Sequence, residues 1–229
     1  MSHWDNDIWT IEGPEVCYRL GGVGIPCPTR ATIVRYAGGG LWVHSPVPWI
    51  QKLSDELAQI GHVEAIVAPN SYHHIHAAEW AARYPNATLL STPDLISLLA
   101  AVKPIPLTEV SGQAWADHIN CQLVDLGSFQ EAMFFHRQSR TLIVTDLMQN
   151  FEASRVKNVF TRWLLKAGGP LAQADNLRLS YALLRASIAN ICVKQSPRQG
   201  NGILCKLSFH TGCRIDQKAI FELNRAFAW

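Results

Sequence analysis

The sequence predicts an α/β fold in which two β-sheets stack face to face and helices cover the outside, a four-layer αββα sandwich. Two observations lead to this prediction. Apolar, β-rich segments fall into two groups along the chain, one before residue 91 and one between residues 121 and 145. Helical segments with one apolar face separate the strands of the first group and follow the second group. Stacked sheets with helices outside bury the apolar faces of all these segments.

Length and composition indicate one sizeable domain with a small appendage. The chain has 229 residues, of which 48% are hydrophobic and 17% are charged, as in ordinary globular proteins with a large core. In residues 1–30 the aromatic residues Trp4, Trp9 and Tyr18 alternate with Gly and Pro. We expect these residues to be an irregular N-terminal arm that packs on the body, and residues 31–229 to form the domain.

Charge and hydropathy limit the classes of partner. The net charge of +2 gives no electrostatic reason to expect nucleic acid, and no apolar run is long enough for a membrane helix. The polar N-terminus has no apolar signal-peptide core, and the six cysteines form no C-x-x-C pair. We therefore expect a cytoplasmic protein with reduced thiols. Its expected partner is a small-molecule substrate, and a homodimer is left open.

The first group of elements begins with a hairpin whose turn is Gly38-Gly39-Gly40. An amphipathic helix follows and ends at Gly61, which is expected to be its C′ residue. A later helix is expected to begin after Thr92 as N-cap, with Pro93 in its first turn. The expected strands are residues 31–37, 41–45, 63–68 and 87–90, and the expected helices are residues 50–60, 77–84 and 94–102.

The second group contains short β-rich segments and ends in helices. Its expected strands are residues 121–126, 132–136, 141–145 and 203–209, and its expected helices are residues 155–166, 176–190 and 216–227.

A histidine-rich turn between the expected strand 63–68 and helix 77–84 is the main candidate site. It holds His73, His74 and His76, three of the nine histidines. Asp146 and His210 also directly follow expected strands. Imidazole and carboxylate groups are common ligands of zinc, iron and manganese. The alternative is a structural polar turn, because adjacent side chains of an extended segment point in opposite directions.

Five segments resemble a known family. They read Leu-Trp-Val-His-Ser-Pro from residue 41, Ala-Pro-Asn-x-x-His-His from residue 68, Phe-Phe-His-Arg-x-Ser-Arg-Thr-Leu from residue 134, Thr-Asp-Leu from residue 145 and a terminal Ala-Phe-Ala-Trp. In this order the chain resembles the metallo-β-lactamase fold superfamily, and more closely an uncharacterised bacterial family of lactamase-like proteins. The resemblance covers roughly residues 30–229 and implies the αββα sandwich named above.

The resemblance implies a partial set of metal ligands. The superfamily's first motif, His-x-His-x-Asp-His, fits in two registers. The preferred register places His73 at the Asp position and His74 at the last His, so that Pro69 and Ser71 replace the first two ligands. The other register places His74 and His76 on the first pair of histidines. The Gly-His-Thr motif is absent, because residues 127–131 contain no histidine.

The resemblance further implies that Asp146 matches the superfamily's bridging aspartate and His210 its last metal histidine. We therefore expect one divalent metal ion, zinc before iron or manganese, and hydrolysis of an ester, thioester or similar bond by metal-activated water. Asp146 and His74 are the expected catalytic residues. The expected metal ligands are His73, His74, His76, Asp146 and His210. The rival prediction is a catalytically degenerate member of the fold that binds a small molecule or a protein.

The other histidines carry no site prediction. His44 and His136 fall on expected strands and are interpreted as structural, and His118 lies in a connector that no motif supports. The sequence has no G-x-S-x-G, Walker or dinucleotide-binding motif, so serine hydrolase, NTPase and Rossmann functions lack support.

Overall fold

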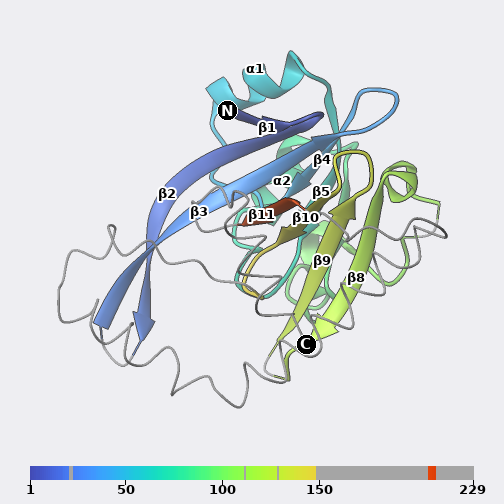
Figure 1. Cartoon of the computed structure of the whole chain (residues 1–229). Helices are drawn as coiled ribbons and strands as arrows, with labels where there is room; N and C mark the ends of the chain where they lie inside the picture. The colour runs from blue at the N-terminus through green and yellow to red at the C-terminus, as the bar shows by residue number, and fades with distance from the viewer. Residues whose placement is uncertain (21–22, 111, 128, 148–205, 210–229) are drawn as a thin grey trace, which may run out of the picture.

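A computed structural model describes residues 1–20, 23–110, 112–127, 129–147 and 206–209 of the chain (Figure 1). The strands are β1 (Ser2–Asp5), β2 (Ile8–Leu20), β3 (Val23–Arg35), β4 (Gly40–His44), β5 (His62–Ala68), β6 (Thr88–Ser91), β7 (Ile105–Pro106), β8 (Ile119–Asp125), β9 (Gln130–His136), β10 (Thr141–Val144) and β11 (Lys206–Phe209). The α-helices are α1 (Gln51–Ala58) and α2 (Ala77–Arg83), and the 3-10 helices are η1 (Pro93–Leu95), η2 (Ala100–Val102) and η3 (Ala114–Asp117).

The strands form two sheets. The first sheet has seven strands in the order β1 to β7, antiparallel from β1 to β4 and parallel from β4 to β7. The second has four strands in the order β11-β10-β9-β8, in which only β10 and β11 run parallel. Because β4 and β5 are parallel, the chain leaves both strands at the same edge of the first sheet.

The centre of the first sheet, at β4, is buried on both faces. All five residues of β4 are buried, as is typical of parallel strands covered on both sides. On one face Val43 and Ile66 pack with Leu53 of α1 and Trp80 of α2. This cluster is the core between the first sheet and the two α-helices, which is why the apolar positions of α1 recur at helical spacing.

The opposite face of the first sheet packs on the second sheet. Trp42 and Val67 share a core with Phe134 of β9 and Ile143 of β10. The two aromatic rings meet edge to face, with 4.8 Å between the ring centroids of Trp42 and Phe134. The arrangement of stacked sheets with outer helices agrees with the predicted α/β sandwich (Figure 1).

The irregular conformation expected for residues 1–30 is wrong. These residues form β1, β2 and most of β3, and in Figure 1 β2 and β3 run together as a long two-stranded ribbon. The register shifts between Glu12 and Glu15, around Gly13-Pro14. Gly and Pro are tolerated at such a bulge in strands, and for that reason they misled the sequence interpretation. The division of the chain at residue 30, which β3 crosses, stays a prediction.

The helix expected over residues 94–102 is also wrong. Residues 93–102 contain the 3-10 helices η1 and η2 with a turn between them. Leu95 and Leu99 are buried all the same, so the apolar spacing was interpreted correctly and the type of helix was not. A 3-10 helix keeps short runs compact and is rarely longer than four residues.

The remaining expected elements before residue 146 are present. Their ends differ from the expected ones by at most two residues, except that β3 begins at Val23, eight residues before the expected start at residue 31. Of the expected strand 203–209, the structure describes β11 (Lys206–Phe209), which pairs with β10. The expected helices 155–166, 176–190 and 216–227 lie outside the described residues. In the described part of the chain, no helix has the length and apolar character needed to cross a membrane.

Candidate functional site

The candidate site lies where the chain leaves β4, β5 and β10. Ser45 follows β4, Asn70 and His73 follow β5, and Asp146 follows β10. His44 lies opposite Val67 in the parallel pair of β4 and β5, so both strands end together. The backbone N–H of Ala132 in β9 donates to the carbonyl oxygen of Pro69 at 2.9 Å. This bond ties the second sheet to the turn after β5.

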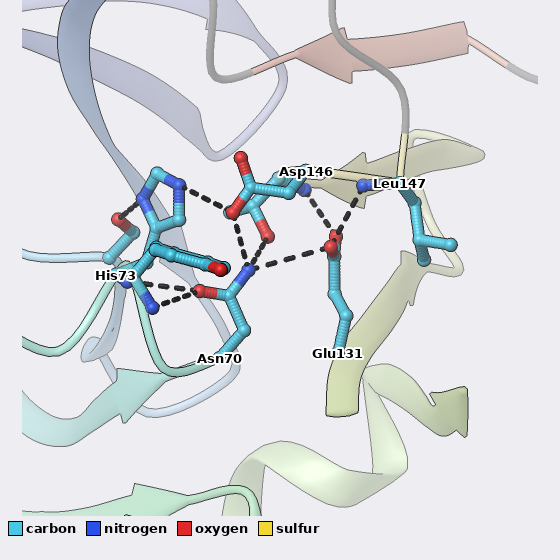
Figure 2. A network of polar contacts seen from close by, with 8 residues as sticks. Asn70, His73, Glu131, Asp146 and Leu147 are labelled. Carbon is cyan, nitrogen blue, oxygen red and sulfur yellow. Dashed lines mark hydrogen bonds and ion pairs between the residues drawn. The ribbon is translucent and has the colours of Figure 1, made fainter. Parts of the chain in front are cut away.

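Asn70 is the centre of the polar network drawn in Figure 2. Its side chain is completely buried. The Oδ1 atom accepts hydrogen bonds from the backbone N–H groups of Tyr72 and His73, at 2.9 Å each, which forms an Asx-turn. The Nδ2 atom donates to Thr145 Oγ1 and to Asp146 Oδ2, also at 2.9 Å each. Asn70 therefore shapes the histidine-rich turn and connects it to the end of β10.

The ring of His73 lies between a hydroxyl and a carboxylate. Its Nε2 atom is 3.2 Å from Asp146 Oδ2, and its Nδ1 atom is 3.0 Å from Ser45 Oγ. The side chains of His73 and Asp146 are 15% and 19% exposed. Both can therefore be reached from solvent, while the groups that hold them, Ser45 and Asn70, are buried.

Glu131 is a buried carboxyl at the start of β9. Its Oε1 atom accepts a hydrogen bond from the backbone N–H of Thr145 at 2.7 Å, and its Oε2 atom accepts one from Leu147 at 2.8 Å. Asn70 Nδ2 lies 3.4 Å from the same Oε2 atom. Burial, followed by the nearby charge of Asp146, raises the pKa of Glu131 to about 7. Glu131 thus carries a proton at mildly acidic pH.

The structure brings together two of the five expected ligands, His73 and Asp146. His74 has a buried Nδ1 atom with no hydrogen-bond partner among the described residues. The Nδ1 atom of His76 lies 3.6 Å from Glu79 Oε2, at the start of α2. His210, the residue after Phe209 of β11, lies outside the described residues.

The three histidines that were interpreted as unrelated to the site have other surroundings. His44 is completely buried and stacks on Trp42, with 5.3 Å between ring centroids. Burial, followed by the effect of His73, lowers the pKa of His44 to about 3, so the ring stays neutral. His136 Nδ1 lies 2.8 Å from Ser139 Oγ, and His118 stacks on Tyr36.

Sequence reasoning missed four residues of the network, Ser45, Asn70, Glu131 and Thr145. For Asn70 a signal was present, because Asn in the turn that follows a strand is typical of an Asx-turn. For Glu131 the signal was an acidic residue in an otherwise apolar strand, Glu-Ala-Met-Phe-Phe, since a buried carboxyl needs partners. Ser45 and Thr145 are ordinary residue types at strand ends, and the sequence alone does not distinguish them.

The network can be tested against the requirements of a metal ion. Two ligands of one tetrahedral zinc ion, each about 2.0 to 2.1 Å from the metal, lie about 3.3 Å apart. The 3.2 Å between His73 Nε2 and Asp146 Oδ2 fits this spacing. Within the described ranges, however, no three His, Cys, Asp or Glu side chains are grouped so that they could hold a metal ion. The described residues thus supply two of the three protein ligands that a catalytic zinc requires.

Solved structures of metallo-β-lactamases resemble this chain over nearly its whole length. A protein from Erythrobacter litoralis in a mono-zinc form has a TM-score of 0.56 at 15% identity, over 96% of this chain and 92% of its own. FIM-1 from Pseudomonas aeruginosa, also in a mono-zinc form, has a TM-score of 0.54 at 10% identity, over 99% and 93%. A metallo-β-lactamase from Pontibacter korlensis has a TM-score of 0.52 at 13% identity, over 97% and 95%. At these identities the likeness shows the fold.

The sequence comparisons identify the family. No curated protein matches the sequence. The model of a family described as Domain of unknown function (DUF4336) matches residues 5–167, which is more than half of the 229 residues. The fold class predicted from the sequence is confirmed by the structural neighbours. The chain therefore belongs to the DUF4336 family and has the metallo-β-lactamase fold.

Proposed function

We propose that this chain hydrolyses an ester, thioester or similar carbonyl bond with one divalent metal ion, held by His73 and Asp146. The observation that carries the proposal is the 3.2 Å distance between His73 Nε2 and Asp146 Oδ2, which suits two ligands of one ion. Zinc, iron or manganese bound there would polarise a carbonyl group and activate water at neutral pH. His74 and His210 are the candidates for the third ligand.

The residues around the two ligands support this function. Asn70 Nδ2 donates to Asp146 Oδ2 and fixes the direction of that carboxylate. Ser45 contacts the ring of His73 on the side away from Asp146. Ligands whose other atoms are held by such hydrogen bonds are typical of protein metal sites. The partial exposure of the His73 and Asp146 side chains gives a small substrate access to them.

A second candidate is a degenerate member of the fold that binds a small molecule or a protein without hydrolysing it. One observation favours it, which is the position of Asn70 between the two acidic side chains. Its neutral amide donates to Asp146 and lies near Glu131, so it partly offsets their repulsion without a cation. A carboxylate at this position would instead have required a cation nearby.

Metal binding separates the two candidates. The full chain is stripped with a chelator, dialysed, incubated with zinc or manganese and measured by elemental analysis and titration calorimetry. The hydrolase proposal predicts about one ion per chain, lost in His73→Ala and in Asp146→Asn. His118→Ala is the matched control, because His118 stacks on Tyr36 and takes no part in the network.

Activity is then measured on a panel of nitrophenyl esters and thioesters. We expect the metal-loaded wild type and His118→Ala to turn over at least one of them, and the two site variants to fall by 100-fold or more. A wild type that binds no metal overturns the hydrolase proposal and leaves the binding function. A wild type that binds metal and hydrolyses equally well without it contradicts the role given to the ion.

A further inference from the structure

Ser45 has an unusual backbone conformation for a residue with a side chain. Its φ angle is +52°, in the left-handed region that non-glycine residues seldom adopt. Its backbone N–H donates to the carbonyl oxygen of Val67 at 2.9 Å, and only 3% of the residue is exposed. Such a conformation is strained and persists where the surroundings impose it, often at functional sites.

This conformation places the Ser45 hydroxyl against the ring of His73. The distance from Oγ to Nδ1 is 3.0 Å, while the opposite nitrogen, Nε2, faces Asp146 at 3.2 Å. A neutral imidazole has one N–H donor and one acceptor nitrogen. An ionised carboxylate can only accept, so the proton of the neutral ring belongs on Nε2. The Nδ1 atom is then an acceptor, and the hydroxyl of Ser45 donates to it.

A metal ion bound to Nε2 would reverse the donor and acceptor roles at the Nδ1–hydroxyl contact. To hold a metal ion, His73 would need the lone pair of Nε2 free, so its ring would carry the proton on Nδ1 and would donate it to an acceptor. The hydroxyl of Ser45 can accept as well as donate. A serine at this place therefore satisfies Nδ1 in both states of the ring, which an aliphatic side chain cannot do.

We propose that Ser45 is a positioning residue of the site, whose hydroxyl holds the His73 ring so that Nε2 is directed at Asp146 and ready to bind the metal. The proposal rests on the function proposed above. The same three groups in the order hydroxyl, imidazole and carboxylate occur in serine hydrolases. Here the serine is buried and its hydroxyl is covered, while His73 and Asp146 are the partly exposed groups. The geometry therefore assigns Ser45 to orientation of His73 and not to nucleophilic attack.

Two substitutions separate the hydroxyl from the strained backbone. Ser45→Ala removes the hydroxyl and keeps a side chain at positive φ, whereas Ser45→Gly removes the hydroxyl and relieves the strain. Ser139→Ala is the matched control. Ser139 is a buried serine whose Oγ lies 2.8 Å from His136 Nδ1, so this variant loses the same kind of serine–histidine contact. Ser139 precedes β10, whereas Asp146 follows it.

The first measurement is zinc affinity by titration calorimetry. We expect the zinc Kd of Ser45→Ala and Ser45→Gly to rise about ten- to a hundredfold, and that of Ser139→Ala to stay within about twofold. If Ser45→Gly binds zinc as tightly as the wild type, the hydroxyl does not position the ligand and the proposal is overturned.

The second measurement needs no metal and no activity. Long-range nitrogen–proton NMR spectra of the chelator-treated full chain report which ring nitrogen of His73 carries the proton. We expect a single tautomer with the proton on Nε2, and broadened or doubled His73 signals in Ser45→Gly. A proton on Nδ1, or signals unchanged in Ser45→Gly, overturns the role of Ser45. This result is independent of whether the wild type binds zinc, so a failure of the hydrolase proposal is distinguished from a failure of this one.

Discussion

Glu131 holds Asp146 in place through the backbone on both sides of it. One oxygen of the Glu131 carboxyl accepts from the N–H of Thr145, and the other accepts from the N–H of Leu147. The residue between them is Asp146, whose side chain projects toward His73 (Figure 2). The direction of the Asp146 carboxylate therefore depends on a buried acid at the start of β9, in the second sheet.

The pKa of Glu131 predicts a dependence of stability on pH. Burial, followed by the charge of Asp146, raises this pKa from its ordinary value of 4.5 to about 7. Between these two values native Glu131 holds a proton that the unfolded chain has released. The free energy of unfolding falls with rising pH wherever the native state binds more protons. The contribution of Glu131 is therefore complete below pH 4.5 and is lost as pH rises to about 7.

Glu131→Gln provides the test in chelator-treated protein. Glutamine is neutral at every pH, so the part of the decline caused by Glu131 should disappear. Urea unfolding of both proteins at about pH 5 and at about pH 8 measures it. We expect the unfolding free energy of the wild type, taken relative to that of the variant, to fall as pH rises. An identical difference at both pH values would show that Glu131 is ionised in the native protein across this range.

Asn70→Asp is predicted to destabilise the metal-free protein and to increase its affinity for metal. The new carboxylate can still accept from the N–H groups of Tyr72 and His73, as Asn70 does. It can no longer donate to Asp146, and it adds a negative charge beside Asp146 and Glu131. An uncompensated buried charge costs about 3 to 5 kcal/mol. A divalent ion would offset this charge, because three carboxyl groups and His73 would surround it.

Urea unfolding of Asn70→Asp with and without zinc or manganese measures both effects. The stability lost without metal should return with metal, and more of it should return than in the wild type. Asn70→Ala is the control, since it also loses the donation to Asp146, together with the bonds from Tyr72 and His73, and adds no charge. If both variants lose equal stability and neither gains from metal, the expected repulsion of the new carboxylate by Asp146 and Glu131 is absent.

Most elements of the first sheet could be predicted because the local pattern of apolar and turn residues agrees with the structure that each segment forms. The strand at residues 63–68 is a short apolar run with a helix after it, and β5 (His62–Ala68) is buried on both faces at its C-terminal end. The prediction for the first 30 residues failed because Gly13 and Pro14 indicate the end of a strand. Their pairing partner lies on β3, and pairing with a distant strand overrides local preference.

The candidate site could be predicted only in part, for a similar reason. His73 and Asp146 were found because imidazole and carboxylate groups suit metals, because both come after expected strands, and because the family resemblance covers both. Asn70 and Asp146 are separated by 76 residues in the sequence, and Asn70 and Glu131 by 61. Contacts of this range depend on how the two sheets stack. A single sequence carries no local pattern for them, so Asn70 and Glu131 were missed although each is an informative residue type.

Trp80 is predicted to anchor the helix that follows the histidine-rich turn. It is completely buried on α2, and its Nε1 atom donates to the carbonyl oxygen of Val47 at 2.7 Å. Trp80→Phe removes this bond and leaves a buried carbonyl without its donor, in addition to the loss of packing. Trp115→Phe is the matched control, because Trp115 is equally buried and its Nε1 atom has no partner in the described part of the chain.

Thermal or urea unfolding of the two variants isolates the hydrogen bond. We expect Trp80→Phe to cost about 1 to 3 kcal/mol more unfolding free energy than Trp115→Phe, the usual penalty for a buried polar group left unpaired. A smaller zinc affinity in Trp80→Phe than in Trp115→Phe would follow if α2 supports the turn. Equal losses in both variants would show that packing alone holds Trp80.

Gly61 is required by a close approach and not by its expected role as the C′ residue of α1. A C′ glycine would adopt a left-handed conformation, but Gly61 is not among the glycines with positive φ in the described residues. A Cβ atom on Gly61 would lie 2.2 Å from the carbonyl oxygen of Gly39, in the turn between β3 and β4. That oxygen also accepts from the N–H of His62 at 3.1 Å, at the start of β5.

Gly61→Ala should therefore push the β3–β4 turn away from β5. The clash is with backbone, which cannot rotate aside, so we expect a loss of about 2 kcal/mol or more in unfolding free energy. Gly38→Ala is the contrasting variant. Gly38 has a φ of +89° and open space around its Cα, so only conformational strain of about 1 kcal/mol is added. A smaller loss for Gly61→Ala than for Gly38→Ala would mean that the β3–β4 turn can move away from β5 at little cost. The left-handed backbone of Gly38 would then be a stronger reason for glycine than the close contact at Gly61.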